Sequence, residues 1–416
     1  MHFYHGDIVF SKNKKELEIH ENSYLAVESG KVFGIYESIP KQYEGAPVTD
    51  HGRALIIPPF SDLHVHGGQY AERGTGMDLI LSDWLSTYTF PEEAKFSDAE
   101  YADRIYKAFV DDMIKNGTFH ASFYTTIHGD TAGHLIKFME DAKMHGFVGK
   151  VNMDMNSPDY LTEDTEESLK ETEAFLEKHI GGERVKPILT PRFAPTCSRE
   201  LLYGLGRLAK KYSVGMQTHL VESIWEKAEA VRLFDDCSCD AEIYEKAGLL
   251  DNGPSILGHF IFPGEDDIRI AKKYNAITVH CPDATNNIIA GIMPAKMLSD
   301  RDIKITLGSD VGAGHGVAVY KQVARAVQLS KLKAFYEPEN NGTLTFAEAF
   351  YMATKEGGEV FGNLGSFEKG KDFEAIVIDG VEDEGLPLSP ANRLERFCYC
   401  GDDRNIIARY IAMDHF

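Results

Sequence analysis

The sequence lacks the features that would place the protein in a membrane or on an export route. No run of apolar residues approaches the roughly 18 that a membrane-spanning helix needs. Residues 1–23 do not show a basic segment followed by an apolar one, which is the pattern of a signal peptide. Six cysteines in 416 residues do not indicate a disulfide framework in such a chain. We therefore expect a cytoplasmic protein with reduced thiols.

Positive charge is also scarce. The chain has 43 Lys and Arg against 65 Asp and Glu, so its formal net charge is −22. An excess of negative charge argues against non-specific binding to nucleic acid or to an anionic membrane surface. It leaves a small base or nucleoside open as a ligand. We expect a small-molecule partner and neither a nucleic acid nor a membrane.

The pattern of apolar runs divides the chain into three zones. Residues 1–55 and 365–416 carry short β-type runs broken by glycine, proline and charged residues, and we predict that they form one small β-sandwich domain. Residues 56–364 alternate short apolar runs with longer amphipathic stretches, and we predict that they form a catalytic domain. A chain of this length suits a large domain with an accessory one.

The middle zone holds eight strand-like runs, most of them followed by a helical stretch. These runs are residues 54–60, 120–127, 149–155, 185–193, 214–220, 255–260, 276–282 and 303–310. Alternation of this kind is typical of parallel βα units, and eight units predict a closed, TIM-type (β/α)8 barrel of the α/β class.

Residues with metal-binding side chains stand where these runs end. His64 and His66 follow the first run two positions apart, so both side chains project from the same face of a strand. His219, His259 and Asp310 stand at the ends of the fifth, sixth and eighth runs. Catalytic groups of a barrel come from the carboxyl ends of its strands. A single histidine there is more often a packed core residue, but five such residues together indicate a metal site.

This arrangement resembles the amidohydrolase superfamily, which carries the same His-x-His, fifth-strand His, sixth-strand His and eighth-strand Asp. Further blocks look like those of its guanine deaminase family, and they span nearly the whole chain. These blocks are residues 84–93, 115–128, 185–198, 308–314 and 401–406. The resemblance implies hydrolytic deamination of guanine to xanthine and ammonia. It also implies a homodimer.

The resemblance further implies one Zn2+ per chain, held by His64, His66, His219 and Asp310. Zinc lowers the pKa of a bound water from about 16 to about 7, so hydroxide is available at neutral pH. The resemblance gives three residues catalytic roles: Glu222 carries a proton from the water to a ring nitrogen, His259 stabilises developing charge, and Asp310 relays a proton.

For substrate binding, the resemblance places Gln69, Arg192 and Phe193 against the base. Arg192 has only donors, which suit the O6 and N7 acceptors of guanine. Phe193 supplies an aromatic contact, and the amide of Gln69 can both donate and accept. Without the resemblance, Arg192 could equally be a surface or salt-bridging residue.

Several alternatives remain at the level of sequence. A two-metal site would need a carboxylated lysine at the end of the third or fourth run, but Lys150 and Lys186 stand at the beginnings of those runs. A related amidohydrolase could act on another purine such as 8-oxoguanine, on a triazine or on a cyclic amide. A metal-free scaffold protein is disfavoured because every expected ligand is present. The H-x-E and P-C-x-x-C signatures of cytidine deaminases are absent.

Some residues of suitable chemistry receive no role. They are His128, Asn156, His280 and the two C-x-C pairs, Cys237 with Cys239 and Cys398 with Cys400.

Overall fold

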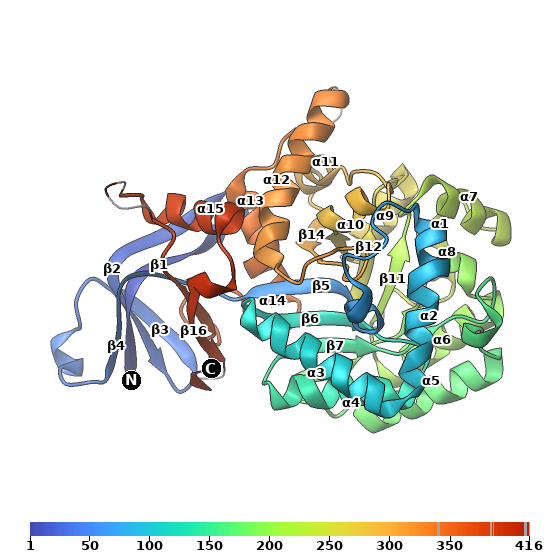
Figure 1. Cartoon of the computed structure of the whole chain (residues 1–416), viewed down its shortest axis with the longest axis horizontal. Helices are drawn as coiled ribbons and strands as arrows, with labels where there is room; N and C mark the ends of the chain where they lie inside the picture. Colours follow the sequence, from blue (N-terminus) through green and yellow to red (C-terminus); the bar gives the residue numbers. More distant parts are fainter. Residues whose placement is uncertain (339–341, 383–384, 386, 412–413, 416) are drawn as a thin grey trace.

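The two ends of the chain pair with each other in one seven-stranded sheet (Figure 1). The computed structural model describes residues 1–338, 342–382, 385, 387–411 and 414–415. The strand order is β17-β16-β15-β4-β1-β2-β3. The strands are β1 (His2–Asn13), β2 (Glu16–Glu28), β3 (Lys31–Tyr36), β4 (Val48–Ile57), β15 (Ala375–Ile378), β16 (Ile406–Ile411) and β17 (Asp414–His415).

Each face of this sheet packs differently. On one face Tyr4 stacks on Phe373 with ring centroids 4.7 Å apart and meets Tyr410 edge-on at 4.8 Å, at the centre of a separate apolar core. On the other face Val9 and Leu55 belong to the main core of the molecule. The terminal segments therefore pair as expected. The domain limits and the second sheet of a sandwich stay predictions.

The middle of the chain forms two four-stranded parallel sheets, ordered β5-β6-β7-β9 and β11-β12-β13-β14. Almost every residue of these strands is buried, as expected for parallel strands covered by helices on the outside. The strands are β5 (Phe60–His66), β6 (Thr118–Tyr124), β7 (His145–Gly149), β9 (Val185–Pro187), β11 (Met216–Leu220), β12 (Ser255–His259), β13 (Ile277–His280) and β14 (Lys304–Leu307). The short strands β8 (Val151–Asn152) and β10 (Thr190–Pro191) pair with each other.

Backbone hydrogen bonds connect the two parallel sheets at both edges. After β9, the Leu189 amide donates to the Gly215 carbonyl at 3.1 Å and its carbonyl accepts from the Gln217 amide at 2.8 Å. After β14, the Asp310 amide donates to the His64 carbonyl at 2.8 Å. The carboxyl ends of β5 and β14 therefore lie side by side.

Amphipathic helices cover the outside of these strands (Figure 1). In α6 the buried face consists of leucines and small residues, including Leu201, Leu202 and Leu205, and the Ser198 side chain caps its first turn. The longer helices are α3 (Ala99–Lys115), α4 (Gly129–Asp141), α5 (Thr165–His179), α6 (Arg199–Tyr212), α7 (Ile224–Leu233), α9 (Glu265–Lys273), α12 (Val319–Tyr336) and α15 (Pro390–Cys400). The shorter ones are α1 (Leu81–Trp84), α2 (Phe90–Glu93), α8 (Asp240–Lys246), α10 (Pro282–Asn287), α11 (Ala295–Asp300), α13 (Phe346–Tyr351) and α14 (Gly357–Glu359).

Two of the predicted runs are displaced from the observed strands. The run 54–60 does not form the first strand of the parallel sheets, because its apolar residues end β4 of the terminal sheet. Pro58 and Pro59 follow, and β5 begins only at Phe60. The third strand, β7, begins at His145, four residues before the run predicted for it.

No helix within the described residues is long and apolar enough to cross a membrane. All six cysteines are free thiols, and all but Cys400 are buried.

Candidate active site

The carboxyl ends of the parallel strands bring the four predicted metal ligands together. His66 Nε2 lies 3.1 Å from His219 Nε2 and 3.2 Å from Asp310 Oδ1. His64 Nε2 lies 3.4 Å from the same Asp310 oxygen. All four side chains are buried. The structure thus gathers His64, His66 and Asp310 into one group that could hold a metal ion, and His64, His219 and His259 into an overlapping one.

The protonation and hydrogen bonding of these imidazoles suit them to bind a metal ion. His219 Nδ1 donates to the Arg192 carbonyl oxygen at 2.6 Å, so its Nε2 lone pair faces His66. Burial lowers the pKa of His66 and of His219, which keeps both rings in the neutral, metal-binding form. Both ring nitrogens of His64 and of His259 have no hydrogen-bond partner among the described residues. Buried polar atoms without partners are costly, and a bound cation would satisfy the lone-pair nitrogen of His64.

Glycines leave the space that His64 occupies. A Cβ at Gly258 in β12 would lie 2.6 Å from His64 Cε1, and a Cβ at Gly308 would lie 2.8 Å from His64 Cβ. Both contacts are shorter than van der Waals distance. Three imidazoles and a carboxylate, held in a cradle that a methyl group would fill, fit a borderline divalent metal ion.

The backbone turns sharply at the strand ends that carry the group. Asp310 has φ 49° and His259 has φ 68°, both in the left-handed region that non-glycine residues rarely adopt. Hydrogen bonds maintain these turns: the Gly314 amide donates to the Asp310 carbonyl at 2.6 Å, and the Phe260 amide, next to His259, donates to the Leu220 carbonyl at 3.1 Å. Strained backbone of this kind is concentrated at functional sites.

Asp62, which received no role from the sequence, fixes β5 to the chain after β14. Its Oδ1 accepts from the Ser309 amide at 2.9 Å and from the His64 amide at 3.3 Å. Burial raises the pKa of Asp62 to about 6. Burial acts in the same direction on Asp310, but the adjacent imidazoles of His64 and His66 outweigh it and hold that pKa well below its usual range.

Glu222 and His259 lie beside the four predicted ligands, His64, His66, His219 and Asp310. Glu222 Oε1 is 3.5 Å from His259 Nε2, and His259 Nε2 is 3.9 Å from Asp310 Oδ2. Burial, with the negative charge of Asp310 as a second cause, raises the pKa of Glu222 to about 8. Burial lowers the pKa of His259 to about 3 and so keeps it neutral. The backbone amide of Glu222 donates to Glu226 Oε2 at 2.7 Å, which fixes the turn into α7.

The three predicted substrate-binding residues line the same pocket. Its volume is about 60 Å3, and Leu81, Trp84 and Leu85 form an apolar wall. The Phe193 ring lies 6.4 Å from the His219 ring, centroid to centroid. The lining residues are His66, Gln69, Leu81, Trp84, Leu85, Arg192, Phe193, His219, Glu222, His259, Ile288, Asp310 and Ala313.

A buried glutamate that the sequence analysis missed connects two of these residues. Arg192 Nη1 donates to Glu93 Oε2 at 2.6 Å and Nη2 donates to Glu93 Oε1 at 3.1 Å. Gln69 Nε2 donates to the same Oε1 at 2.8 Å. Glu93 ends a block that served only for the resemblance. The sequence signal was its pair of adjacent acidic residues after a proline.

Tyr124, at the end of β6, was missed as well. Its ring centroid lies 4.6 Å from that of His64 and 4.9 Å from that of His66. Its position at a strand end was the available signal. The ring packs against the candidate ligands and limits their movement.

The residues without a role lie outside the group. His280 ends β13 and is buried, which lowers its pKa to about 3. Asn156 Nδ2 donates to the Pro195 carbonyl at 2.7 Å, and His128 stands at the start of α4. The buried Lys150 forms an ion pair with Glu163, and Lys186 is exposed.

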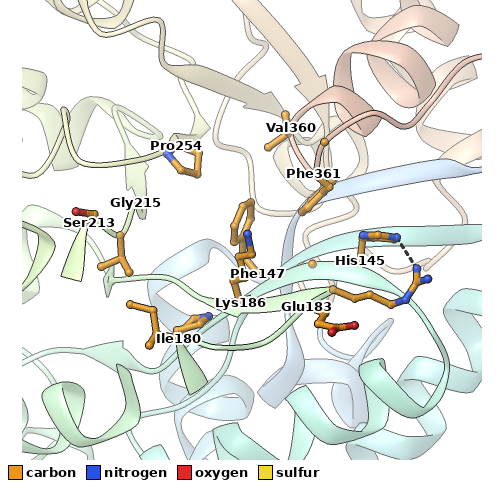
Figure 2. Close-up of a pocket in the computed structure, with 15 residues that line it drawn as sticks. His145, Phe147, Ile180, Glu183, Lys186, Ser213, Gly215, Pro254, Val360 and Phe361 are labelled. Atoms are coloured by element: carbon orange, nitrogen blue, oxygen red, sulfur yellow. Dashed lines mark hydrogen bonds between the residues drawn. The ribbon is translucent and has the colours of Figure 1, made fainter. Parts of the chain in front are cut away.

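A larger cavity, of about 490 Å3, lies at the opposite ends of the strands (Figure 2). Phe147 and Phe361 face each other there with ring centroids 5.2 Å apart, and His145 and Lys186 also line it. His145 begins β7, Lys186 lies in β9 next to its first residue, and Phe361 follows α14. Active sites of such folds lie at the carboxyl ends, so the smaller pocket is the candidate.

Comparison with known proteins agrees with this geometry. Residues 55–412 match the model of the amidohydrolase family. The guanine deaminase of Dictyostelium discoideum is 31% identical over 98% of this chain and 96% of its own, and that of Rattus norvegicus is 33% identical over 98% and 95%. The crystal structure of guanine deaminase from C. acetobutylicum, with guanine bound in its active site, is 41% identical, with a TM-score of 0.95 over 100% of this chain and 99% of that one. The chain therefore belongs to the amidohydrolase family and, within it, to the guanine deaminases.

Proposed function

We propose that this protein catalyses the hydrolytic deamination of guanine to xanthine and ammonia. One observation carries the proposal: three of the candidate metal ligands, His66, His219 and Asp310, line the same pocket as Gln69, Arg192 and Phe193. The relative from C. acetobutylicum, which shares 41% of its residues, has guanine in its active site.

We propose further that His64, His66, His219 and Asp310 hold one zinc ion. Imidazole and carboxylate ligands suit zinc, and such a set leaves a position open. When bound, zinc would lower the pKa of a water and so supply hydroxide at neutral pH. A bridging lysine of a two-metal site has no support, because Lys150 is paired with Glu163.

The protein's own side chains move the protons of the reaction. A bond forms between the water oxygen and C2 of guanine, and the bond between C2 and its amino group breaks. Glu222 takes one proton from the water and delivers it to N3, for which a pKa of about 8 is well placed. Asp310 passes the second proton to the departing amine, which leaves as ammonia. The neutral His259 stabilises charge on the reacting carbon.

Base selection follows from the chemistry of Arg192. Of its five N–H donors, two are used by Glu93, so three remain for a ligand. Guanine offers O6 and N7 as acceptors, whereas adenine has an amino donor in place of O6. Adenine also has no amine at C2. Placing a donor against a buried guanidinium costs about 2 kcal/mol or more.

The proposal is tested with purified, metal-loaded protein and a panel of bases followed spectrophotometrically. We expect conversion of guanine to xanthine with one ammonia released, and no turnover of adenine or cytosine. 8-Oxoguanine, a triazine and a cyclic amide belong in the same panel. Arg192→Ala should lower kcat/KM for guanine at least about 100-fold, as expected when a charged hydrogen-bonding partner is lost, with metal content unchanged. Efficient adenine or cytosine turnover, or normal guanine kinetics of the variant, would overturn the proposal.

We also propose the finer architecture and assembly. The hydrogen bonds between β5 and the chain after β14, and between the chain after β9 and β11, support closure of the two parallel sheets into a (β/α)8 barrel. The terminal segments would form a small β-sandwich domain beside it. We propose finally that the protein is a cytoplasmic homodimer; light scattering would measure its oligomeric state.

A further inference from the structure

The carboxylate of Glu93 accepts hydrogen bonds from both polar residues that would recognise the base. Its Oε2 accepts from Arg192 Nη1 at 2.6 Å. Its Oε1 accepts from Arg192 Nη2 at 3.1 Å and from Gln69 Nε2 at 2.8 Å. The side chain is only 1% exposed, so no bulk water competes for these oxygens. One buried carboxylate thus sets the place of two substrate-binding side chains.

The contacts also decide which way the Gln69 amide faces. A carboxylate can only accept and a backbone amide can only donate. Gln69 Nε2 points to Glu93, and Gln69 Oε1 accepts from the Gly312 amide at 3.1 Å. A flipped amide would place a donor against the Gly312 amide and an acceptor against the carboxylate. The amide is therefore locked, with one N–H and one lone pair left for a ligand.

The fork of Arg192 is locked in the same way. Glu93 takes one N–H from each terminal nitrogen, which leaves three donors, including Nε–H. Phe90, from the same short helix α2, lies with its ring centroid 5.4 Å from the Arg192 guanidinium carbon. Carboxylate and ring together fix the plane of the guanidinium, and a fixed plane is what bidentate recognition requires.

The chain around α2 is built to bring Glu93 to this point. Gly68, next to Gln69, has no side chain to obstruct it, since a Cβ there would lie 3.3 Å from Glu93 Cγ and 2.7 Å from Thr126 Cγ2. The neighbouring Glu92 points elsewhere and accepts from Lys95 Nζ at 2.5 Å and from the Tyr101 hydroxyl. Two adjacent glutamates therefore have different partners.

We propose that Glu93 is the positioning residue that makes the pocket selective for a 6-oxopurine edge. It acts through Arg192 and Gln69 and touches no reacting atom. The inference rests on the proposed function, because it concerns how the same pocket recognises its base.

Glu93→Gln tests it with almost no change of size. If the amide oxygen takes the place of Oε1, the amide nitrogen opposes the Arg192 Nη1 donor. If it takes the place of Oε2, the nitrogen opposes both the Gln69 Nε2 and Arg192 Nη2 donors. Neither arrangement can satisfy all three donors. Glu92→Gln is the matched control, because it makes the same change one residue away from the pair.

The readout is the selectivity between two unreactive ligands measured as inhibitors of the metal-loaded enzyme. Hypoxanthine carries the O6 acceptor and unsubstituted purine does not. The selectivity ratio is the inhibition constant of purine divided by that of hypoxanthine. We expect this ratio to fall at least about tenfold in E93Q, which corresponds to about 1.4 kcal/mol. The ratio should stay within about twofold of wild type in E92Q, and the metal content of both variants should be that of wild type.

A purely structural role would lower the melting temperature and weaken both ligands alike. E93Q with a wild-type ratio, or E92Q with the same loss, would overturn the inference. In the Arg192→Ala background E93Q should have little further effect on the ratio, because a residue that acts through another is not additive with it. An additive effect would show that Glu93 does not act through Arg192.

Glu93→Asp covers the case in which E93Q does not fold. It keeps both acceptors on a shorter stem, so we expect a ratio between those of wild type and Arg192→Ala. A wild-type ratio in E93D would count against the inference. If the wild-type enzyme does not convert guanine but its preference for hypoxanthine over purine is lost in E93Q and kept in E92Q, the proposed function fails and the positioning role of Glu93 stands. If it converts guanine and E93Q keeps its ratio, only this inference fails.

Discussion

Buried histidines lie at both ends of the parallel strands, but they differ in whether their ring nitrogens have hydrogen-bond partners. At the carboxyl ends, both ring nitrogens of His64 and of His259 are without partners among the residues that the structure describes. At the amino ends, His120 Nδ1 contacts Ser61 Oγ at 2.8 Å and its Nε2 contacts Glu374 Oε2 at 2.6 Å. Nearby, Arg184 Nη1 donates to His145 Nε2 at 2.6 Å.

This difference separates a site from a structural network. Buried histidines that have found protein partners lower the free energy of the fold by themselves. Buried histidines that face one another without donors or acceptors need something the chain does not supply. The larger cavity lies at the paired end and the smaller pocket at the unpaired end. Pairing is therefore a better guide to the active site here than cavity size.

The largest expected effect comes from removing a histidine at the unpaired end. His66→Ala should reduce bound metal to well below one equivalent and turnover to below detection, because a ligand is lost while the strand remains. His120→Ala is the control at the paired end. It should keep its metal and lose about 1–3 kcal/mol of unfolding free energy, since Glu374 loses its buried partner.

Metal analysis and denaturant unfolding of both variants check this prediction. Two metal equivalents in the wild type, or full activity of metal-free protein, would exclude the single-zinc proposal. Loss of metal from the His120 variant would show that the two ends are not independent.

Glu222→Gln should have the next largest effect. The amide keeps the shape of the side chain but cannot take a proton from water, so we expect kcat to fall at least about 100-fold with a smaller change in KM. Steady-state kinetics on guanine measure both. Near-normal turnover would mean that another residue carries the proton.

The smallest effect concerns pH at the paired end. Burial, followed by the charges of His120 and Arg184, lowers the pKa of His145 from 6.5 to about 3 in the folded protein. Its contribution to stability is complete above about pH 6.5 and is lost as the pH falls towards 3, because the unfolded state binds the proton first. When the pH is lowered from 7 to 5.5, the free energy of unfolding of the wild type should fall by about 1 kcal/mol more than that of His145→Gln.

Urea unfolding at the two pH values measures this difference. Equal losses in the wild type and the variant would show that His145 is protonated in the folded protein. The glutamine oxygen still accepts from Arg184, so the variant isolates the titration.

Much of the parallel-strand core could be predicted from the sequence because its signals are local. The runs that end in His219 and His259 are nearly the observed β11 and β12, since buried parallel strands are short and apolar. The first run was misplaced because prolines divide it between two sheets. The periodicity of one segment cannot show which sheet it joins.

Site residues at strand ends could be predicted from the sequence. Site residues on segments that fold back over the pocket could not. His64 and Asp310 could be placed together because parallel strands share an end. Glu93 could not, because its distance from Arg192 depends on how the segment with α1 and α2 folds back over the pocket. Asp62 was missed for a related reason, since its partner Ser309 lies far along the chain.

The left-handed backbone at His259 and Asp310 has a consequence for engineering the protein to withstand heat. Glycine would adopt both conformations without strain, and asparagine at little cost, so either substitution would look favourable in a search for stabilising mutations. Each would remove a side chain on which the proposed chemistry depends. Libraries selected for thermal tolerance alone should therefore accumulate inactive proteins altered at these two positions, and a selection that also demands turnover should exclude them.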